Sequence, residues 1–363
     1  MAPTAPTRTS ARRASSRTTT DTRAASPGAS SIQPKRKAVH PVLSEQADAT
    51  QIDSTSTDAT SHAQTLTLAK KPRKKSASDS DSASAPKSQD TTADPSLPKN
   101  TQMPATLSFA RPRAPGSLRI TAWNITSLKS SEPKGMLRYL EAEDADIAVL
   151  SETKVNDVPM HPALTKIYKH QYWAIGKQKG YAGLAILSKI QPIKAIYGLP
   201  SLKDQDTKGR IVTLEFENSF LVGTYAVNAG LAELDAQKPI IWCGDLNVVQ
   251  DERDLAAASK KWNKSPGYTA IECDAHRQLL QGTATPTSKP LVDVWRQQHP
   301  DAIGHYTFYG WRGFCRSKGI GWRLDSFILS ERIAPKALEC EIRHECYGAS
   351  DHVPIYCDIQ GPL

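Results

Sequence analysis

The chain has 363 residues and a formal net charge of +9, from 46 Lys or Arg and 37 Asp or Glu side chains. The excess charge lies at one end, because residues 1–115 contain 17 basic and 9 acidic side chains whereas 116–363 contain 29 and 28. No apolar run approaches the roughly 18 residues of a membrane span, so we expect a soluble intracellular protein. Any affinity of residues 116–363 for nucleic acid must come from a local basic surface and not from their net charge.

Residues 1–115 predict a disordered tail. They are rich in Ser, Thr, Ala, Pro and charged residues and nearly lack aromatic side chains, so they bury too little apolar surface to offset chain entropy. Two basic clusters, PKRK at 34–37 and KKPRKK at 70–75, favour nuclear import receptors as partners, although such clusters also serve only to solubilise a chain. The first twenty residues lack acids, which is typical of a mitochondrial transit peptide, so we expect the nucleus first and the mitochondrion second.

From residue 118 onward, short β-like runs alternate with helical windows. The apolar runs predict strands at 118–123, 147–150, 183–187, 211–216, 220–227, 240–243, 323–329 and 353–358. Apolar residues at helical spacing predict helices at 134–143, 268–280 and 291–298. Mixed strands and helices over about 245 residues suit one α/β domain, 116–363, in which two packed sheets are flanked by helices.

Polar side chains of a few chemical kinds follow several of these predicted strands. Taken singly, each is more typical of a solvated turn or a surface pair. Together they offer only carboxylate, carboxamide and imidazole groups, which suit a hard cation such as Mg²⁺ or Mn²⁺. The six cysteines show no C-x-x-C pair or zinc-ligand spacing and add no thiolate. The strand-end residues are Asn124, Glu152, Asn228, Asp245, Asn247, Asp325, Asp351 and His352.

The folded part contains, in order, the segments LRITAWNITSLKS, DIAVLSETKV, GYAGLAILSK, GR, YAVNAG, CGDLNV, YTFYGWRGFCRSKGIGWRLDSFILS and GASDHVPI. These segments resemble the motifs of the exonuclease III type of apurinic/apyrimidinic (AP) endonucleases, and the resemblance covers residues 118–359. The wider superfamily of DNase I-like nucleases and inositol polyphosphate phosphatases shares SDH and GD-x-N, whereas GWRLD and YTF narrow the resemblance to AP endonucleases. The resemblance implies a DNase I-like, four-layered sandwich of two mixed β-sheets flanked by helices.

The resemblance also implies a function. We expect a DNA repair nuclease that hydrolyses the phosphodiester 5′ to an abasic site in duplex DNA during base excision repair, with 3′-exonuclease or 3′-phosphodiesterase activity beside it. The enzyme would be a monomer whose partner is double-stranded DNA and whose cofactor is Mg²⁺ or Mn²⁺. The resemblance places Glu152 as the main metal ligand and Asp351 as a second or outer ligand. The metal cluster is completed by Asn124, Asp245, Asn247 and His352.

Catalytic roles are implied for residues of the same cluster. Asp245 would position and deprotonate the attacking water, and Asn247 would hold Asp245 and the phosphate. His352, whose tautomer and orientation Asp325 would set, would contact the phosphate. Whether Asp245 or His352 is the base stays open. Two further residues would contact the phosphate: Tyr225 and Asn228.

Substrate choice is implied by a second group of residues. In the family, an abasic deoxyribose enters a small apolar pocket too narrow for a base, and a nucleotide without a base costs least to unstack. Core packing is the alternative interpretation, and it is the favoured one for Leu324 alone. The pocket positions are Phe308, Trp322 and Leu324. Flanking residues that would contact backbone phosphate are Arg316, Lys318 and Arg323, with Arg210 as a weaker candidate.

Three features depart from the family pattern. Thr126 stands where an acid or amide is usual, and Phe314 replaces an Asn of the DNA-contacting loop. Only residues 231–238 connect the strands at 220–227 and 240–243, whereas a parallel crossover usually takes a dozen residues or more. We therefore expect no helix there, and we hold open an alternative function as a degenerate, non-catalytic DNA-binding member of the family.

Overall fold

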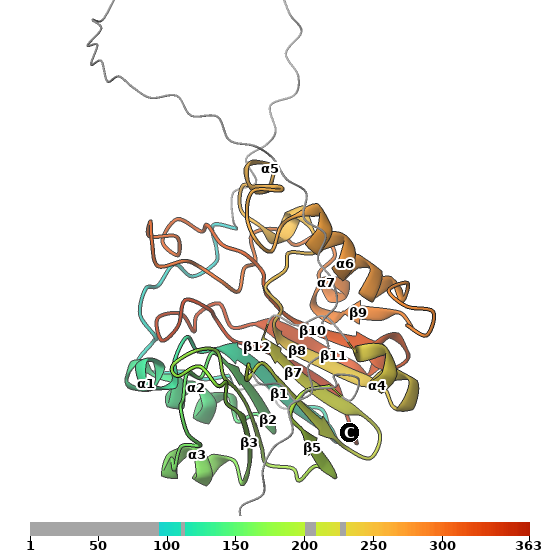
Figure 1. The fold of residues 1–363 in the computed structure, drawn as a ribbon. Coiled ribbons are helices and arrows are strands. Elements are labelled where there is room, and N and C mark those ends of the chain that lie inside the picture. The colour runs from blue at the N-terminus through green and yellow to red at the C-terminus, as the bar shows by residue number, and fades with distance from the viewer. Residues whose placement is uncertain (1–93, 110–112, 200–207, 226–229) are drawn as a thin grey trace, which may run out of the picture. The chain divides into compact units, whose positions relative to one another are not determined.

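The computed structural model describes residues 94–109, 113–199, 208–225 and 230–363 (Figure 1). The tail up to residue 93, both of its basic clusters and Asn228 lie outside the described residues. Among the helices that are described, none is both long and apolar enough to cross a membrane.

Two six-stranded mixed sheets form the centre of the described part. The first has the order β11 (Ala337–Ile342), β12 (Ile355–Gln360), β1 (Ser117–Asn124), β2 (Ile147–Ser151), β4 (Leu184–Ser188) and β3 (His170–Ala174). The second has the order β5 (Lys194–Ile196), β6 (Ile211–Glu215), β7 (Phe220–Tyr225), β8 (Ile240–Asp245), β10 (Asp325–Ser330) and β9 (Leu291–Asp293). The pairs β1–β2 and β7–β8 are parallel, whereas β12 and β10 run antiparallel to β1 and β8.

Apolar residues alternate between the two faces of each sheet, as strand geometry requires. In β1, Ile120 and Ala122 face the core between the sheets, and Trp123 packs in a second cluster on the outer face. In β8, Ile241 joins the central core and Trp242 a third cluster on the other outer face. The predicted sandwich is therefore confirmed.

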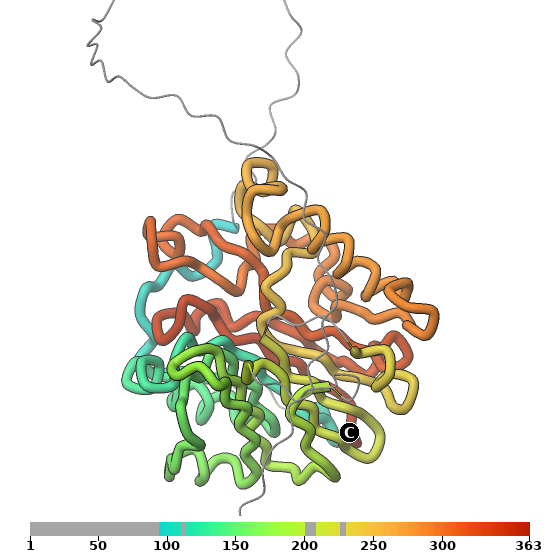
Figure 2. The backbone as a smooth tube through the Cα atoms, in the orientation of Figure 1, coloured from blue at the N-terminus to red at the C-terminus, as the bar shows by residue number. Residues whose placement is uncertain are grey.

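Helices cover the outer faces of both sheets (Figures 1 and 2). Those beside the first sheet are α1 (Leu128–Ser131), α2 (Met136–Glu143) and α3 (Pro162–Ile167). Those near the second sheet are α4 (Leu231–Gln237), α6 (Ala270–Gln281) and α7 (Val294–Gln298), whereas α5 (Ala258–Lys261) lies farther out, at the top of Figure 1. Short 3-10 helices are η1 (Glu132–Lys134), η2 (Glu252–Asp254) and η3 (Glu331–Lys336).

The connection between β7 and β8 corrects one prediction. Helix α4 forms there, with Leu231 and Leu234 buried in the third cluster, although we expected no helix. The prediction was wrong because it treated 231–238 as an extended link, whereas Leu231–Gln237 form a helix, and the chain has 14 residues between Tyr225 of β7 and Ile240 of β8. That length satisfies the usual minimum for a parallel crossover.

Other boundaries also differ from the sequence expectation. All eight predicted strands are present with ends shifted by a few residues, but β3, β5, β9 and β11 were missed because their short runs carry few β-branched residues. The window 291–298, predicted as helix, begins as β9 and becomes α7 only at Val294.

Residues 94–109, here called the strap, correct the predicted domain boundary. Met103, Leu107 and Phe109 pack against the cluster on the outer face of the first sheet. Arg138 of α2 donates a hydrogen bond to the Pro104 carbonyl at 2.7 Å. The folded part therefore includes the strap and does not begin at residue 116.

Candidate active site

The site forms where strands of the two sheets end next to each other. Asn124 closes β1, Glu152 follows β2 and Asp245 closes β8. The Asn124 Nδ2 group donates hydrogen bonds to Glu152 Oε1 and to Asp245 Oδ2, both at 2.9 Å. One carboxamide thus joins a carboxylate of the first sheet to one of the second, and the predicted convergence of these residues is present.

The backbone around this edge is strained. Thr126, Glu152, Lys154 and Asn247 have φ between 52° and 60°, in the left-handed region. This conformation is rare for residues other than Gly, above all for a β-branched residue such as Thr, and it tends to persist at functional sites. The strain is a reason to assign function to the strand ends rather than to treat them as ordinary turns.

Gly244 allows β8 to deliver Asp245 to the site. Its φ is 131°, and a Cβ there would lie 2.2 Å from the carbonyl oxygen of Thr224 on β7. The strands can approach this closely only because residue 244 lacks a side chain.

A buried acid–imidazole–acid row crosses the site. His352 Nδ1 lies 2.7 Å from Asp325 Oδ2, and His352 Nε2 lies 3.8 Å from Asp245 Oδ2. Burial alone would lower the pKa of His352, but the negative charges of Asp325 and Asp245 outweigh it and raise that pKa well above its ordinary value. Burial raises the pKa of Asp245, and the neighbouring Asp325 charge adds to this. The row therefore favours an imidazolium beside a carboxylate able to accept a proton near neutral pH.

Glu152 stays ionised. Its burial would raise its pKa, but hydrogen bonds from Asn124 and Lys154 and the Lys154 charge outweigh burial and lower the pKa. The Lys154 ammonium lies 2.7 Å from Glu152 Oε2. Tyr225 also hydrogen-bonds Glu152, and burial together with that carboxylate raises the pKa of the Tyr225 hydroxyl, which keeps it protonated.

Asp351 is held by the hydroxyl of Thr126, at the position where the sequence comparison led us to expect an acid or amide. Thr126 Oγ1 donates to Asp351 Oδ1 at 2.8 Å and lies 2.7 Å from Ser350 Oγ, which itself donates to the Asn124 carbonyl. Thr126 thus orients Asp351 and adds no charge.

An apolar wall faces these polar groups across a cavity of about 370 Å³. The Phe308 ring lies 5.0 Å from the His352 ring, and Leu324 is nearly buried while Trp322 remains partly exposed. The Lys261 ammonium lies 4.6 Å above the Trp322 ring, an interaction that fixes the indole. The cavity is lined by Thr126, Glu152, Lys154, Asp245, Asn247, Pro266, Phe308, Trp322, Leu324, Asp351 and His352.

The oxygen groups fit Mg²⁺ or Mn²⁺ better than a softer metal. Glu152 and Asp351 line one cavity, and the neighbouring donors are amide and hydroxyl groups. Within the described ranges, no three His, Cys, Asp or Glu side chains form a closed metal cage. Mg²⁺ does not need one, because it commonly binds one or two carboxylates and keeps waters and substrate phosphate as its other ligands.

Two predicted phosphate contacts are corrected by burial. Arg323 has an exposed fraction of 2% and pairs with Asp254 and Asp293 at 2.7–2.8 Å. Arg316, at 3%, bonds Asn100 of the strap. Neither guanidinium can reach DNA without breaking these contacts.

Of the other predicted contacts, Lys318 is exposed, and Arg210 is partly buried. The Arg210 guanidinium lies between the Tyr181 and Tyr225 rings, at 5.5 and 5.0 Å, and donates to the Tyr181 hydroxyl. Sequence reasoning missed Lys154 and Lys261. Lys154 could have been found, because it is a basic residue only two positions after the predicted metal ligand Glu152.

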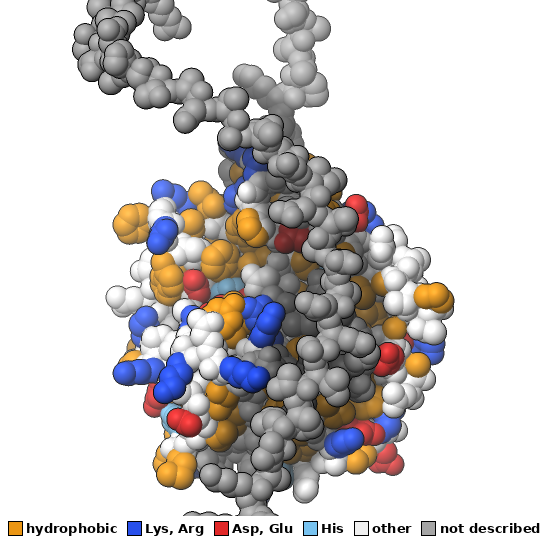
Figure 3. Space-filling view, in the orientation of Figure 1, with side chains coloured by type: hydrophobic (Ala, Val, Ile, Leu, Met, Phe, Trp, Pro, Cys, Tyr) orange, Lys and Arg blue, Asp and Glu red, His pale blue; other side chains and the backbone are white. Residues whose placement is uncertain are grey.

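Basic side chains also flank the cavity. Figure 3 shows Lys and Arg gathered over loops that Figure 1 draws in green, where Lys177 and Lys179 are exposed. This loop packs next to the one that carries Lys154, because the Gly180 N–H donates to Asn156 Oδ1 at 2.9 Å. A local basic surface therefore exists despite the small net charge of residues 116–363.

A model of the Endonuclease/Exonuclease/phosphatase family matches residues 121–352. The chain is 36% identical over 262 residues to the DNA repair nuclease APEX1 of Danio rerio, covering 66% of this chain and 81% of that protein. It is 34% identical over 260 residues to an exodeoxyribonuclease of Bacillus subtilis, covering 66% and 98%. The chain belongs to the exonuclease III type of AP endonucleases.

This membership confirms the resemblance drawn from the sequence motifs. Among solved structures, an AP endonuclease from Archaeoglobus fulgidus superimposes with a TM-score of 0.56 at 24% identity, covering 67% of this chain and 100% of that one. The likeness supports the fold, with its two mixed sheets flanked by helices. The family match begins at residue 121, so the strap lies before it.

Proposed function

We propose that the protein is a DNA repair nuclease that hydrolyses the phosphodiester 5′ to an abasic site in duplex DNA. The observation that carries the proposal is the shared cavity, in which Glu152, Asp245 and His352 face Phe308 and Trp322. Hydrolytic groups thus stand next to an apolar wall that a sugar without its base could contact. An undamaged nucleotide would have to unstack its base to enter, at a cost of a few kcal/mol.

The residues of the cavity would have separate roles in the hydrolysis of the phosphodiester. Asp245 accepts the proton of the attacking water, His352 as an imidazolium neutralises phosphate charge, and Asp325 holds the imidazolium in place. Asn247 fixes Asp245, because its backbone N–H donates to Asp245 Oδ1 at 3.0 Å. Tyr225 supplies a hydroxyl donor at the phosphate.

Glu152 and Asp351 are the proposed holders of the metal, with Asn124 setting the orientation of Glu152. A bound Mg²⁺ or Mn²⁺ offsets phosphate charge and stabilises the leaving oxygen. Lys154 shares Glu152, so the ammonium must release that carboxylate, at least in part, when a cation binds.

DNA contacts are proposed for Lys177, Lys179 and Lys318, with Arg210 beside Tyr225. Backbone contacts of this kind position a duplex and do not read its sequence. Asn228, outside the described residues, remains a proposed phosphate contact. We further propose a monomeric enzyme that reaches the nucleus through import receptors bound to the basic clusters at 34–37 and 70–75, with 3′-exonuclease activity at the same site.

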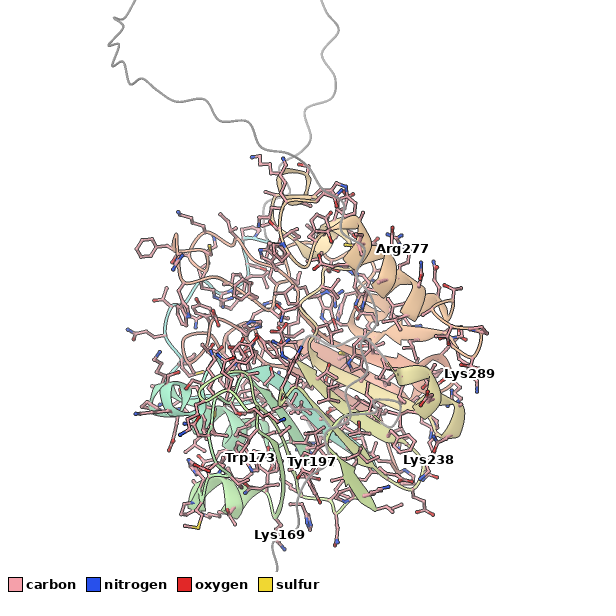
Figure 4. All side chains as sticks on the ribbon, viewed as in Figure 1. Lys169, Trp173, Tyr197, Lys238, Arg277 and Lys289 are labelled. Atoms are coloured by element: carbon pink, nitrogen blue, oxygen red, sulfur yellow. The ribbon has the colours of Figure 1, made fainter. Side chains whose placement is uncertain are left out.

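The test uses a duplex with one tetrahydrofuran abasic analogue and an undamaged duplex of the same sequence. The full chain should nick the first immediately 5′ of the analogue in Mg²⁺, and EDTA or Asp245→Asn should abolish the nick. Lys289→Ala is the matched control, because this exposed lysine lies on the α4 side of the molecule (Figure 4). Tight binding of the lesion without a nick would overturn the proposal and favour the non-catalytic alternative.

A further inference from the structure

The strap passes over the loop that leads to Asp351. Met103 of the strap packs into the outer cluster of the first sheet. A Cβ added to Gly348 would lie 2.5 Å from the Met103 backbone nitrogen, so the two segments are in direct contact. Residues 94–109 therefore contact the loop that precedes Asp351, although they lie before the stretch that the family model matches.

Asn100 is the centre of this contact. Its Nδ2 group donates to the Glu345 carbonyl at 2.9 Å and to the Tyr347 carbonyl at 3.2 Å. Its Oδ1 accepts from Arg316 Nη2 at 3.0 Å, and its backbone carbonyl accepts from Arg316 Nε at 3.3 Å. A single side chain thus bonds both the segment that carries Arg316 and the segment 345–347.

Arg316 continues the contact toward the site. Its guanidinium lies 4.7 Å from the Tyr309 ring and 5.1 Å from the Tyr347 ring, and it also bonds the His344 carbonyl. The Tyr347 hydroxyl donates to the Tyr309 carbonyl at 3.1 Å, and the Tyr309 N–H donates to the Asp351 carbonyl at 2.8 Å. Every step from Asn100 to the backbone of Asp351 is therefore a hydrogen bond or a packed ring.

We propose that the strap is a positioning element of the active site, in which Asn100 holds loop 343–350 and, through Arg316, loop 310–320. The first loop carries Asp351 and His352 to the cavity, and the second flanks the apolar wall. Neither Asn100 nor Arg316 touches the reacting atoms. Their effect comes from fixing the two loops, because a displacement of about 1 Å in catalytic groups reduces turnover by about 100-fold. The proposal rests on the proposed function.

Two variants of Asn100 in the full chain separate its bonds to loop 343–350 from its side-chain bond to Arg316. Asn100→Asp keeps the oxygen that Arg316 needs and loses the donor to loop 343–350, so kcat should fall about 10- to 100-fold with KM little changed. Asn100→Ala removes the side-chain bonds to both loops and leaves only the backbone bond to Arg316, so kcat should fall similarly and KM should rise as well. Leu107→Ala is the control, because it weakens strap packing while every hydrogen bond of Asn100 stays in place, and its kcat should equal that of the wild type.

Amide hydrogen exchange of residues 343–352 without DNA provides a readout that needs no activity. Both Asn100 variants should exchange faster there than the wild type and Leu107→Ala. Unchanged exchange would overturn the proposal, and so would faster exchange with the kcat of the control. If the wild type itself does not nick abasic DNA, the proposed function fails, and the exchange result alone then decides whether the strap holds the loop.

Discussion

Replacing Arg323 tests whether this guanidinium supports the fold or contacts DNA. It pairs with Asp254 and Asp293, and Asp254 also pairs with Arg296. The four charges balance, and the exposed side-chain fractions are 1% for Arg323, 0% for Asp254 and 4% for Asp293. In Arg323→Met, one buried carboxylate loses its partner, a change that costs about 3–5 kcal/mol. For a domain of this size that corresponds to a melting temperature lower by about 6–20 °C.

Urea denaturation at pH 7 measures this loss as a lower midpoint with an unchanged slope. The matched control is Arg277→Met, whose pair with Asp274 is more than half exposed and lies on α6 (Figure 4). That substitution should cost less than about 1 kcal/mol. Adding Asp293→Asn to Arg323→Met removes the unpaired charge and keeps the cap of α7, so it should restore part of the stability.

The opposite pattern would refute the reasoning. If Arg323→Met unfolds at the wild-type midpoint but binds duplex DNA more weakly, with a shallower salt dependence, then Arg323 contacts phosphate. The ion-pair network would then contribute little to the stability of the fold.

Three other perturbations follow from the structure. His276 packs beside Trp242, and burial lowers the pKa of its imidazole to about 4, whereas the unfolded chain keeps the ordinary value of about 6.5. Between these two values only the unfolded chain binds the proton, so the free energy of unfolding should fall by up to about 1.4 kcal/mol per pH unit from pH 6.5 toward 4. In His276→Phe, a plot of denaturation midpoint against pH should be flatter over this range. Gly244→Ala places a Cβ against the Thr224 carbonyl and should reduce kcat at least about 10-fold by displacing Asp245, as steady-state nicking rates would show. Trp322→Ala widens the cavity wall, so the ratio of kcat/KM for abasic over undamaged duplex should fall, by about 10-fold, while an unchanged ratio would exclude the indole from selection.

The strand-end residues could be predicted because two independent patterns meet there. Short apolar runs predicted the strands, and the polar residues that ended them had chemistry suited to a cation. Asn124 and Glu152 then had to lie together, because β1 and β2 are parallel neighbours whose carboxyl ends share one edge. Asp245 ends a strand of the other sheet and meets Asn124 only because the two sheets pack with these ends adjacent. The left-handed backbone of Glu152 and Asn247 was not visible in the sequence, because strain of this kind is imposed by surrounding contacts.

The roles of Arg316 and Arg323 could not be read from their positions in a DNA-binding motif. A charged residue type predicts a solvated or phosphate-bound side chain, and only tertiary structure brings Asp254 and Asn100 to these guanidinium groups. The packing of the strap on the fold was also not predicted from the sequence. Its composition resembles that of the tail, and few apolar side chains anchor it to the fold.

The division of the site between two sheets explains why stability and activity should be coupled here. Asn124 and Glu152 belong to the first sheet and Asp245 and Asp325 to the second, while His352 follows a loop fixed by the strap. A shift of one sheet over the other lengthens the Asn124–Asp245 hydrogen bond and the His352–Asp325 contact together. Some substitutions in the core between the sheets change its volume without unfolding the chain. They should lower kcat more than they raise KM, because they alter the spacing of the catalytic groups and leave the exposed DNA-facing lysines in place.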